Sequence, residues 1–119
     1  MSSHKSSLAA IVEDEWLPRM AVADALSEIG WDVVEFASGE QALEYLAAGH
    51  VVRLLVTDIR LTGPVTGWQV AEQFRARYPD LVVVYCSGNP LDAAQQVSGS
   101  TFMVKPCPMG QLLEACGRP

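Results

Sequence analysis

An α/β fold, with a five-stranded parallel sheet and helices on both faces, is predicted by three features of the sequence. Five short runs rich in valine, isoleucine and leucine have the length of buried strands. Segments with apolar residues at helical spacing alternate with them. Strict alternation of the two patterns favours parallel strands joined by right-handed helical crossovers. The 119 residues, 50% of them hydrophobic, suffice for one domain with a continuous core.

The predicted strands follow the apolar runs. Four runs are almost purely apolar, namely 8–12 (LAAIV), 53–57 (RLLVT), 81–86 (LVVVYC) and 101–104 (TFMV). The remaining run, 31–37 (WDVVEFA), is more mixed, which favours a place nearer an edge of the sheet.

Apolar stripes predict the helices between these strands. The stripes are Val22, Ala25, Leu26 and Ile29; Val70, Phe74 and Tyr78; and Met109, Leu112, Leu113 and Cys116. Pro18 is acceptable in a first helical turn, and Gly30 marks a helix end. Ser38, with Gln41 three residues later, predicts a capping box at the start of a further helix that Gly49 closes.

Charge and composition exclude several classes of protein. A net charge of −6, with eight scattered basic residues, argues against broad contact with a nucleic acid backbone. No apolar stretch has the length of a membrane span or a signal peptide, so we expect a soluble cytoplasmic protein. Cys86, Cys107 and Cys116 lack metal-ligand spacing and are predicted to be reduced thiols, the first two packed as small apolar side chains.

Ligands of such sheets bind beyond the carboxyl ends of the strands, where the strand order reverses. The loops expected at that edge are 13–15 (EDE), 58–60 (DIR), 87–89 (SGN) and 105–108 (KPCP). Each of them carries a chemically capable side chain immediately after its strand. The functional site is therefore expected in these four loops.

Three acids in these loops predict a metal site. Glu13, Asp14 and Asp58 converge if the first and third strands are neighbours. Like charges about 4 Å apart repel by roughly 4 kcal/mol per pair at an effective dielectric near 20, so they require a cation. Ligation by oxygen alone suits Mg²⁺. Lys105 adds a positive charge to the same edge, and Ser87 adds a hydroxyl that can donate to an anionic oxygen.

Carboxylates, a divalent metal, a lysine and a hydroxyl together favour phosphoryl transfer, in which positioning and charge neutralisation supply most of the catalysis. Asp58 follows a fully apolar strand in the middle of the predicted sheet. We therefore expect Asp58 to act as the nucleophile while the other acids hold the metal.

The motifs VEDE, VTDIRL, YCSG and VKP, in this order and spacing, make the chain resemble a two-component response-regulator receiver domain from about Leu8 to the last helix. The resemblance implies a flavodoxin-like (βα)5 fold with strand order 2-1-3-4-5. It also implies that Glu13, Asp14 and the backbone carbonyl of Arg60 bind Mg²⁺ (or Mn²⁺) together with Asp58. Asp58 would accept phosphate from a histidine kinase or a histidine phosphotransfer protein.

The same resemblance assigns roles to further residues. Ser87 would move toward the phosphoryl group, Lys105 would pair with that group, and Phe102 would change rotamer as the switch aromatic. The bond between Lys105 and Pro106 is expected to be cis, which an X–Pro bond permits. Side chains at Arg60 and Asn89 would tune the lifetime of the phosphoryl group.

The sequence departs from the receiver pattern in its loops. Gly67 follows Asp58 by nine residues, about one more than is usual, and Thr66 stands where an acid is common. The path of this loop is left open.

The last third of the chain departs as well. Lys105 follows Ser87 by only 18 residues, which leaves 90–97 (PLDAAQQV) as a short fourth helix. Cys107 stands where a bulky apolar residue is usual. Dimerisation through the last helices is thus less assured, and a monomer or weak dimer is expected.

The favoured hypothesis is a stand-alone receiver domain over residues 8–119, after a disordered tail over residues 1–7. It would be a signalling domain rather than an enzyme, with no membrane or nucleic acid partner. A receiver-like interaction domain that works without phosphorylation is one alternative. A phosphohydrolase with an aspartate nucleophile would carry a D-x-D pair after the first strand, and a flavin carrier a Ser/Thr/Gly-rich phosphate loop; the sequence there reads EDE.

Overall fold

The computed structural model describes residues 6–89 and 95–119, which form one parallel sheet in the order β2-β1-β3-β4-β5. The strands are β1 (Leu8–Val12), β2 (Asp32–Phe36), β3 (Leu54–Thr57), β4 (Val82–Ser87) and β5 (Thr101–Val104). Every neighbouring pair is parallel. The predicted fold class and strand order are therefore confirmed, and the mixed run at 31–37 supplies an edge strand.

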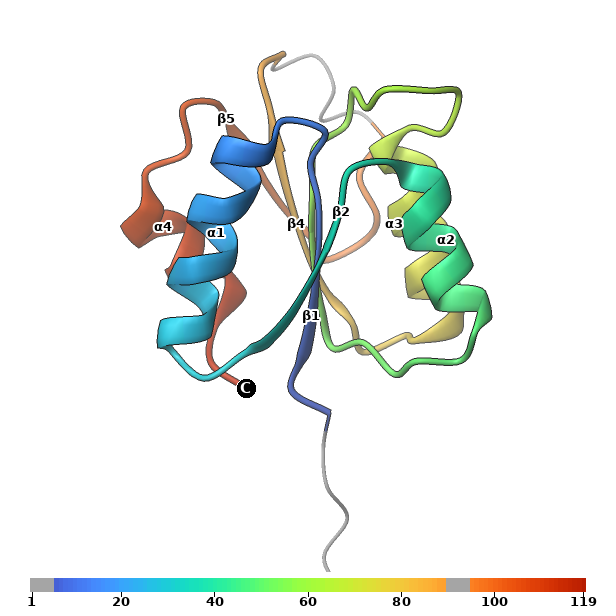
Figure 1. Cartoon of the computed structure of the whole chain (residues 1–119), viewed down its shortest axis with the longest axis horizontal. Coiled ribbons are helices and arrows are strands. Elements are labelled where there is room, and N and C mark those ends of the chain that lie inside the picture. Colours follow the sequence, from blue (N-terminus) through green and yellow to red (C-terminus); the bar gives the residue numbers. More distant parts are fainter. Residues whose placement is uncertain (1–5, 90–94) are drawn as a thin grey trace, which may run out of the picture.

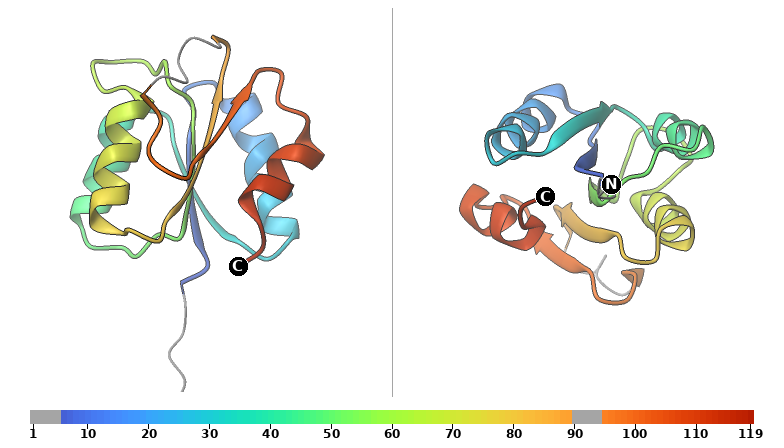
Figure 2. Two further views of the ribbon diagram at one scale, coloured as in Figure 1. Left: turned by 180° about the vertical axis from the view of Figure 1, so that it is seen from behind. Right: turned by 90° about the horizontal axis from the view of Figure 1, so that it is seen from below.

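Helices cover both faces of the sheet. They are α1 (Trp16–Glu28), α2 (Gly39–Ala47), α3 (Gly67–Arg77) and α4 (Met109–Cys116). Figure 1 shows α1 and α4 on one face and α2 and α3 on the other, and both views in Figure 2 show the same layers. The helix predicted at 90–97 falls mainly on 90–94, outside the described residues, whereas Gln96 to Ser100 form a turn that the Gln96 side chain closes.

Alternation along the strands divides the core into two halves. Successive side chains of a strand point to opposite faces. In β1, Ala10 and Val12 therefore join the cluster under α2 and α3, while Ala9 and Ile11 join the cluster under α1 and α4. All four side chains are buried. The nearly continuous apolar runs of the sequence arise because both faces of the central strands are covered.

The helix starts differ from the prediction in one respect. The Ser38 hydroxyl caps α2 by accepting from the Gln41 backbone N–H at 3.3 Å, but the Gln41 side chain accepts from the Ala37 N–H instead of the N–H of Ser38. A complete capping box is found at α3, where Thr66 and Gln69 each accept from the other's backbone N–H. The residue that replaces the usual acid thus fixes the start of α3.

Gly67 brings α3 into direct contact with the end of β3. A Cβ atom on Gly67 would lie 2.8 Å from both the carbonyl carbon of Asp58 and the Cα atom of Ile59. The Gly67 N–H also donates to the Ile59 carbonyl at 2.8 Å. The nine-residue loop is therefore closed at its base by the contact between α3 and the end of β3.

The amino-terminal end of the described chain is attached to the sheet. The Ser6 hydroxyl donates to the Val51 carbonyl at 2.6 Å, and the Ser7 hydroxyl donates to Asp32 at 2.7 Å. The predicted tail extends through residue 7, whereas these bonds fix its last two residues. None of the helices among the described residues combines the length and the apolar character that crossing a membrane requires.

The prediction of three reduced thiols is wrong for two of the cysteines. Cys86, at the end of β4, forms a disulfide with Cys107, in the loop between β5 and α4. Their Cα atoms lie 6.6 Å apart, within the range that a disulfide spans. Cys116 is free and buried. Residue spacing along the chain does not indicate this pairing, because it depends on how β4 and β5 align.

Candidate functional site

The ends of β1 and β3 bring three carboxylates together. Val12 and Thr57 are register partners, and the Asp58 N–H donates to the Val12 carbonyl at 3.0 Å. The residues that follow each strand therefore lie level at the same edge of the sheet. One carboxylate oxygen from each of Glu13, Asp14 and Asp58 lies within 4.8 Å of the other two. The convergence that the sequence predicts is present.

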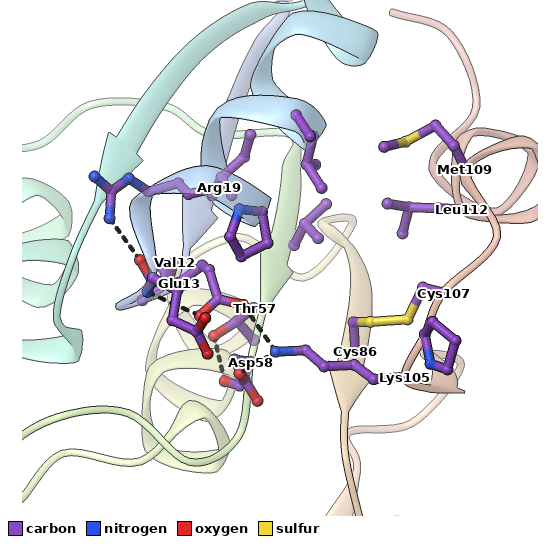
Figure 3. Close-up of a pocket in the computed structure, with 17 residues that line it drawn as sticks. Val12, Glu13, Arg19, Thr57, Asp58, Cys86, Lys105, Cys107, Met109 and Leu112 are labelled. Atoms are coloured by element: carbon purple, nitrogen blue, oxygen red, sulfur yellow. Dashed lines mark hydrogen bonds and ion pairs between the residues drawn. A yellow bond between two sulfur atoms is a disulfide. The ribbon is translucent and has the colours of Figure 1, made fainter.

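Lys105 joins two of these acids. Its Nζ atom donates to Glu13 Oε1 at 2.9 Å and to Asp58 Oδ2 at 2.7 Å (Figure 3). The Lys105 backbone N–H donates to the Ser87 carbonyl at 2.8 Å, which fixes the start of the loop after β5 against the end of β4. The ammonium group thus lies between acids that come from two different strands.

Burial and charge shift the proton affinities of these groups. Burial acts to lower the pKa of Lys105, but its hydrogen bonds to Asp58 and Glu13 outweigh burial and raise that pKa, so the side chain stays cationic. Burial raises the pKa of Glu13 despite the opposing hydrogen bond from Lys105. Burial also acts to raise the pKa of Asp14, but hydrogen bonds, first among them that from Thr62, hold it below its usual value.

Backbone and side-chain donors orient the Asp58 and Glu13 carboxylates. The Ile59 N–H donates to Asp58 Oδ1 at 2.7 Å, so the two oxygens of Asp58 face different donors. The Glu15 N–H donates to Glu13 Oε2 at 3.1 Å. The Thr57 hydroxyl donates to the Asp58 carbonyl at 2.7 Å. The bonds from Ile59 and Glu15 hold the two carboxylates in place, and the bond from Thr57 fixes the backbone of Asp58.

A comparison with protein families decides the class of this site. The profile of the response regulator receiver domain matches residues 9–116. The chain belongs to the response-regulator receiver family. This family forms part of two-component systems, and the receiver fold and the acidic edge agree with the assignment.

Relatives of known sequence or structure support the assignment. A response regulator receiver protein from Sinorhizobium medicae WSM419 superimposes with a TM-score of 0.89 at 32% identity, over 94% of this chain and 92% of that one. The sensor kinase CckA of Brucella abortus is 32% identical over 90% of this chain, and the response regulator FleR of Pseudomonas aeruginosa 30% identical over 91%. The chain spans only 12% and 23% of the length of these two curated relatives.

Other predicted residues of the receiver domain lie on β4 and β5 or in the loops near the acids. Ser87 is buried at the end of β4, and its hydroxyl accepts from the Asn89 N–H at 3.2 Å. Phe102 on β5 is half-buried, with its ring centroid 6.3 Å from that of Tyr85 and 6.4 Å from that of Trp68. Arg60 is exposed in the loop after β3. The peptide bond between Lys105 and Pro106 is cis, as expected.

Sequence reasoning missed two contacts of the receiver site. The Thr62 hydroxyl, in the long loop after β3, donates to Asp14 Oδ2 at 2.8 Å. The Arg19 guanidinium donates to the Glu13 carbonyl at 2.7 Å and forms an ion pair with Glu35 at 3.3 Å. No sequence pattern marks either residue, because each reaches the site only through the path of the chain in space.

A cavity of about 530 Å³ opens beside the acids. Its apolar walls include Val22 of α1. Met109 and Leu112 of α4 also line it (Figure 3). Asp58 and Lys105 lie at its polar side, and the disulfide between Cys86 and Cys107 forms part of its wall. The site is thus accessible from the face of the sheet that α1 and α4 cover.

The acidic group fits a divalent cation. Three carboxylates face one ammonium group, which leaves excess negative charge at the edge of the sheet. Octahedral Mg²⁺ with bonds of about 2.1 Å places its ligand oxygens roughly 3 to 4 Å apart. Oxygens already within 4.8 Å of one another need only small shifts to reach that spacing. The residues present therefore fit Mg²⁺, as receiver domains generally require.

Replacing Glu13 by glutamine is expected to weaken Mg²⁺ binding by about tenfold or more, because a neutral amide replaces a buried carboxylate of the group. Isothermal titration of Mg²⁺ into wild type and into Glu13→Gln measures the change in affinity. Glu15→Gln is the matched control, since its exposed carboxylate lies outside the acidic group. Equal affinities in Glu13→Gln and Glu15→Gln would show that Glu13 holds no metal.

Proposed function

We propose that this receiver domain accepts a phosphoryl group on Asp58 in a reaction that depends on Mg²⁺. The observation that carries the proposal is the position of Lys105, whose Nζ atom lies 2.7 Å from Asp58 and 2.9 Å from Glu13. A cation fixed beside the acceptor carboxylate can neutralise charge on an incoming phosphoryl group. Asp14 completes the acidic group from the same loop as Glu13.

The residues divide the work of the transfer. An oxygen of Asp58 attacks the phosphorus atom, and the bond between phosphorus and the donor atom breaks. The leaving group keeps the electron pair and takes a proton from solvent. Glu13, Asp14, Asp58 and the backbone carbonyl of Arg60 would hold Mg²⁺ or Mn²⁺, which supplies positive charge to the phosphoryl oxygens when bound. Lys105 contacts the same oxygens from the side of β5.

Phosphorylation then changes the surface of the domain. It adds about −1.5 to −2 charges at one edge of a packed sheet. The Ser87 hydroxyl moves toward the phosphoryl group, and Phe102 changes rotamer against Tyr85 and Trp68, its present neighbours. Arg60 and Asn89 adjust how long the acyl phosphate survives. A partner protein reads the altered surface, or the phosphoryl group passes on in a relay.

The cellular setting follows from this chemistry. The phosphoryl donor is a histidine kinase or a histidine phosphotransfer protein in the cytoplasm. The receiver domain spans residues 8–119 and acts as a monomer or weak dimer, without catalysing reactions other than its own phosphorylation and dephosphorylation.

Intact-mass spectrometry tests the proposal. We expect wild-type protein, incubated with Mg²⁺ and a small acyl-phosphate donor, to gain one phosphoryl group, and Asp58→Ala to gain none. Removal of Mg²⁺ by a chelator should stop the gain in wild type. A wild type that stays unmodified with Mg²⁺ present would favour a receiver-like interaction domain that works without phosphorylation. An equal gain in Asp58→Ala would place the acceptor elsewhere.

A further inference from the structure

The disulfide between Cys86 and Cys107 joins the end of β4 to the loop before α4. We propose that these two cysteines are a redox-active pair and that their reversible oxidation controls phosphorylation of the domain. The effect on phosphorylation rests on the proposed function. The redox activity of the pair does not, and it is tested separately.

The two cysteines lie next to Ser87 and Lys105 along the chain. Cys86 immediately precedes Ser87, and Cys107 follows Lys105 by two positions. The Lys105 N–H donates to the Ser87 carbonyl at 2.8 Å between them. The disulfide therefore adds a covalent link at the end of the paired strands β4 and β5, beside this backbone hydrogen bond. Ser87 and Lys105 are the two groups that have to adjust around a phosphoryl group, so the link restrains the segments that carry both.

The pair is also accessible to small reagents. Both cysteines are partly exposed and line the cavity of about 530 Å³ beside Asp58. Figure 3 shows the bond at the wall of this cavity. Cys116 provides an internal contrast, because it is only 3% exposed and burial raises the pKa of its thiol to about 12. Thiol chemistry needs both access and a thiolate, so exchange is directed to Cys86 and Cys107.

The reaction is a thiol–disulfide exchange with a small-molecule disulfide such as glutathione disulfide. The thiolate of one cysteine attacks a sulfur of glutathione disulfide, which forms a mixed disulfide and releases one glutathione thiolate. The second cysteine thiolate then attacks the protein sulfur of that mixed disulfide and releases the second glutathione. The protein pair loses two electrons, which reduce glutathione disulfide to two thiols, and the two cysteine protons pass to these thiols through solvent.

The direction of control follows from the restraint. The oxidised pair holds Ser87 and Lys105 in the arrangement described here, so it opposes the adjustment that phosphorylation requires. Reduction removes the covalent link between the two segments and favours the phosphorylated form. Because such coupling is reciprocal at equilibrium, phosphorylation should also make the disulfide easier to reduce.

A redox titration tests the pair itself. Wild-type protein is equilibrated at a series of ratios of reduced to oxidised glutathione, quenched with acid, denatured and alkylated. We expect the number of alkylated cysteines to change reversibly from three to one in a single two-electron transition, with Cys116 alkylated throughout. Cys107→Ser should show no such transition. Three free thiols at every ratio, or a disulfide that no ratio reduces, would overturn the proposal.

A phosphorylation assay tests the control. Oxidised and reduced wild type are treated with Mg²⁺ and an acyl-phosphate donor, and we expect the reduced form to gain phosphate at least about fivefold faster. The variant with both Cys86→Ala and Cys107→Ala should react at one rate in both buffers. Equal rates for the two forms of wild type would overturn the control but leave the proposed function intact. Lack of phosphate gain even in the reduced form would overturn the proposed function, and with it the control.

Discussion

Replacing Gly67 by alanine is expected to lower the free energy of unfolding by about 3 kcal/mol, because a methyl group would overlap the backbone at the end of β3. The new Cβ atom would lie 2.8 Å from the carbonyl carbon of Asp58 and from the Cα atom of Ile59. These are backbone atoms in a strand end and cannot move aside as a flexible side chain would. Either α3 shifts outward or Asp58 leaves its position beside Lys105. Urea unfolding followed by circular dichroism measures the loss.

Gly110→Ala is the matched control for this substitution. Gly110 lies in the first turn of α4, and a Cβ atom there would meet no other atom within 4 Å. Alanine in a helix is favoured over glycine by roughly 0.5 to 1 kcal/mol, so this variant should be as stable as wild type or slightly more stable. Similar losses in the two variants would mean that the contact between α3 and Asp58 is not what constrains Gly67.

Replacing Lys105 by methionine is expected to slow phosphoryl transfer from an acyl-phosphate donor by about 100-fold, the usual size of the effect when one preorganised donor is removed. Methionine keeps most of the length of the side chain but removes the ammonium group that contacts Asp58 and Glu13. The rate of phosphate gain, followed by intact mass at fixed Mg²⁺, measures the change. Arg118→Met removes the same charge from an exposed position at the end of the chain and should leave the rate unchanged.

We also expect Lys105→Met to change the stability of the domain and its dependence on Mg²⁺. Without Lys105 the carboxylates of Glu13 and Asp58 face each other uncompensated, so the variant should unfold more readily than wild type in a chelator. Mg²⁺ should then stabilise Lys105→Met by more than it stabilises wild type, because the ion takes over the neutralisation. If Lys105→Met gains phosphate as fast as wild type and Mg²⁺ stabilises both proteins equally, Lys105 has no role in the site.

Much of the site could be predicted because it depends on local patterns. Alternating apolar runs and helical stripes fix a parallel sheet, and the carboxyl ends of parallel strands meet at one edge. Residues that immediately follow strands, such as Glu13, Asp58 and Lys105, are therefore brought together whatever the loops do between them. Their proximity in the structure reflects this constraint.

The features that the sequence does not predict depend on the path of the loops and on the alignment of the strands. Thr62 reaches Asp14 only through the path of a nine-residue loop, and no spacing rule describes that path. The pairing of Cys86 with Cys107 depends on the alignment of β4 with β5, which their apolar sequences leave undetermined. The capping box at Thr66 is not predicted either, because the family resemblance marks this position only as the usual place of an acid.

The most direct test of Asp58 as the phosphoryl acceptor is to identify the residue that carries the phosphoryl group. Sodium borohydride reduces an aspartyl phosphate to homoserine, which peptide sequencing by mass spectrometry then identifies. After incubation with Mg²⁺ and an acyl-phosphate donor, homoserine is expected at position 58 and at no other acid, and its yield should fall to background with a chelator. Homoserine at another position, or its absence from position 58 in protein that has gained phosphate, would contradict the assignment of Asp58 as the acceptor.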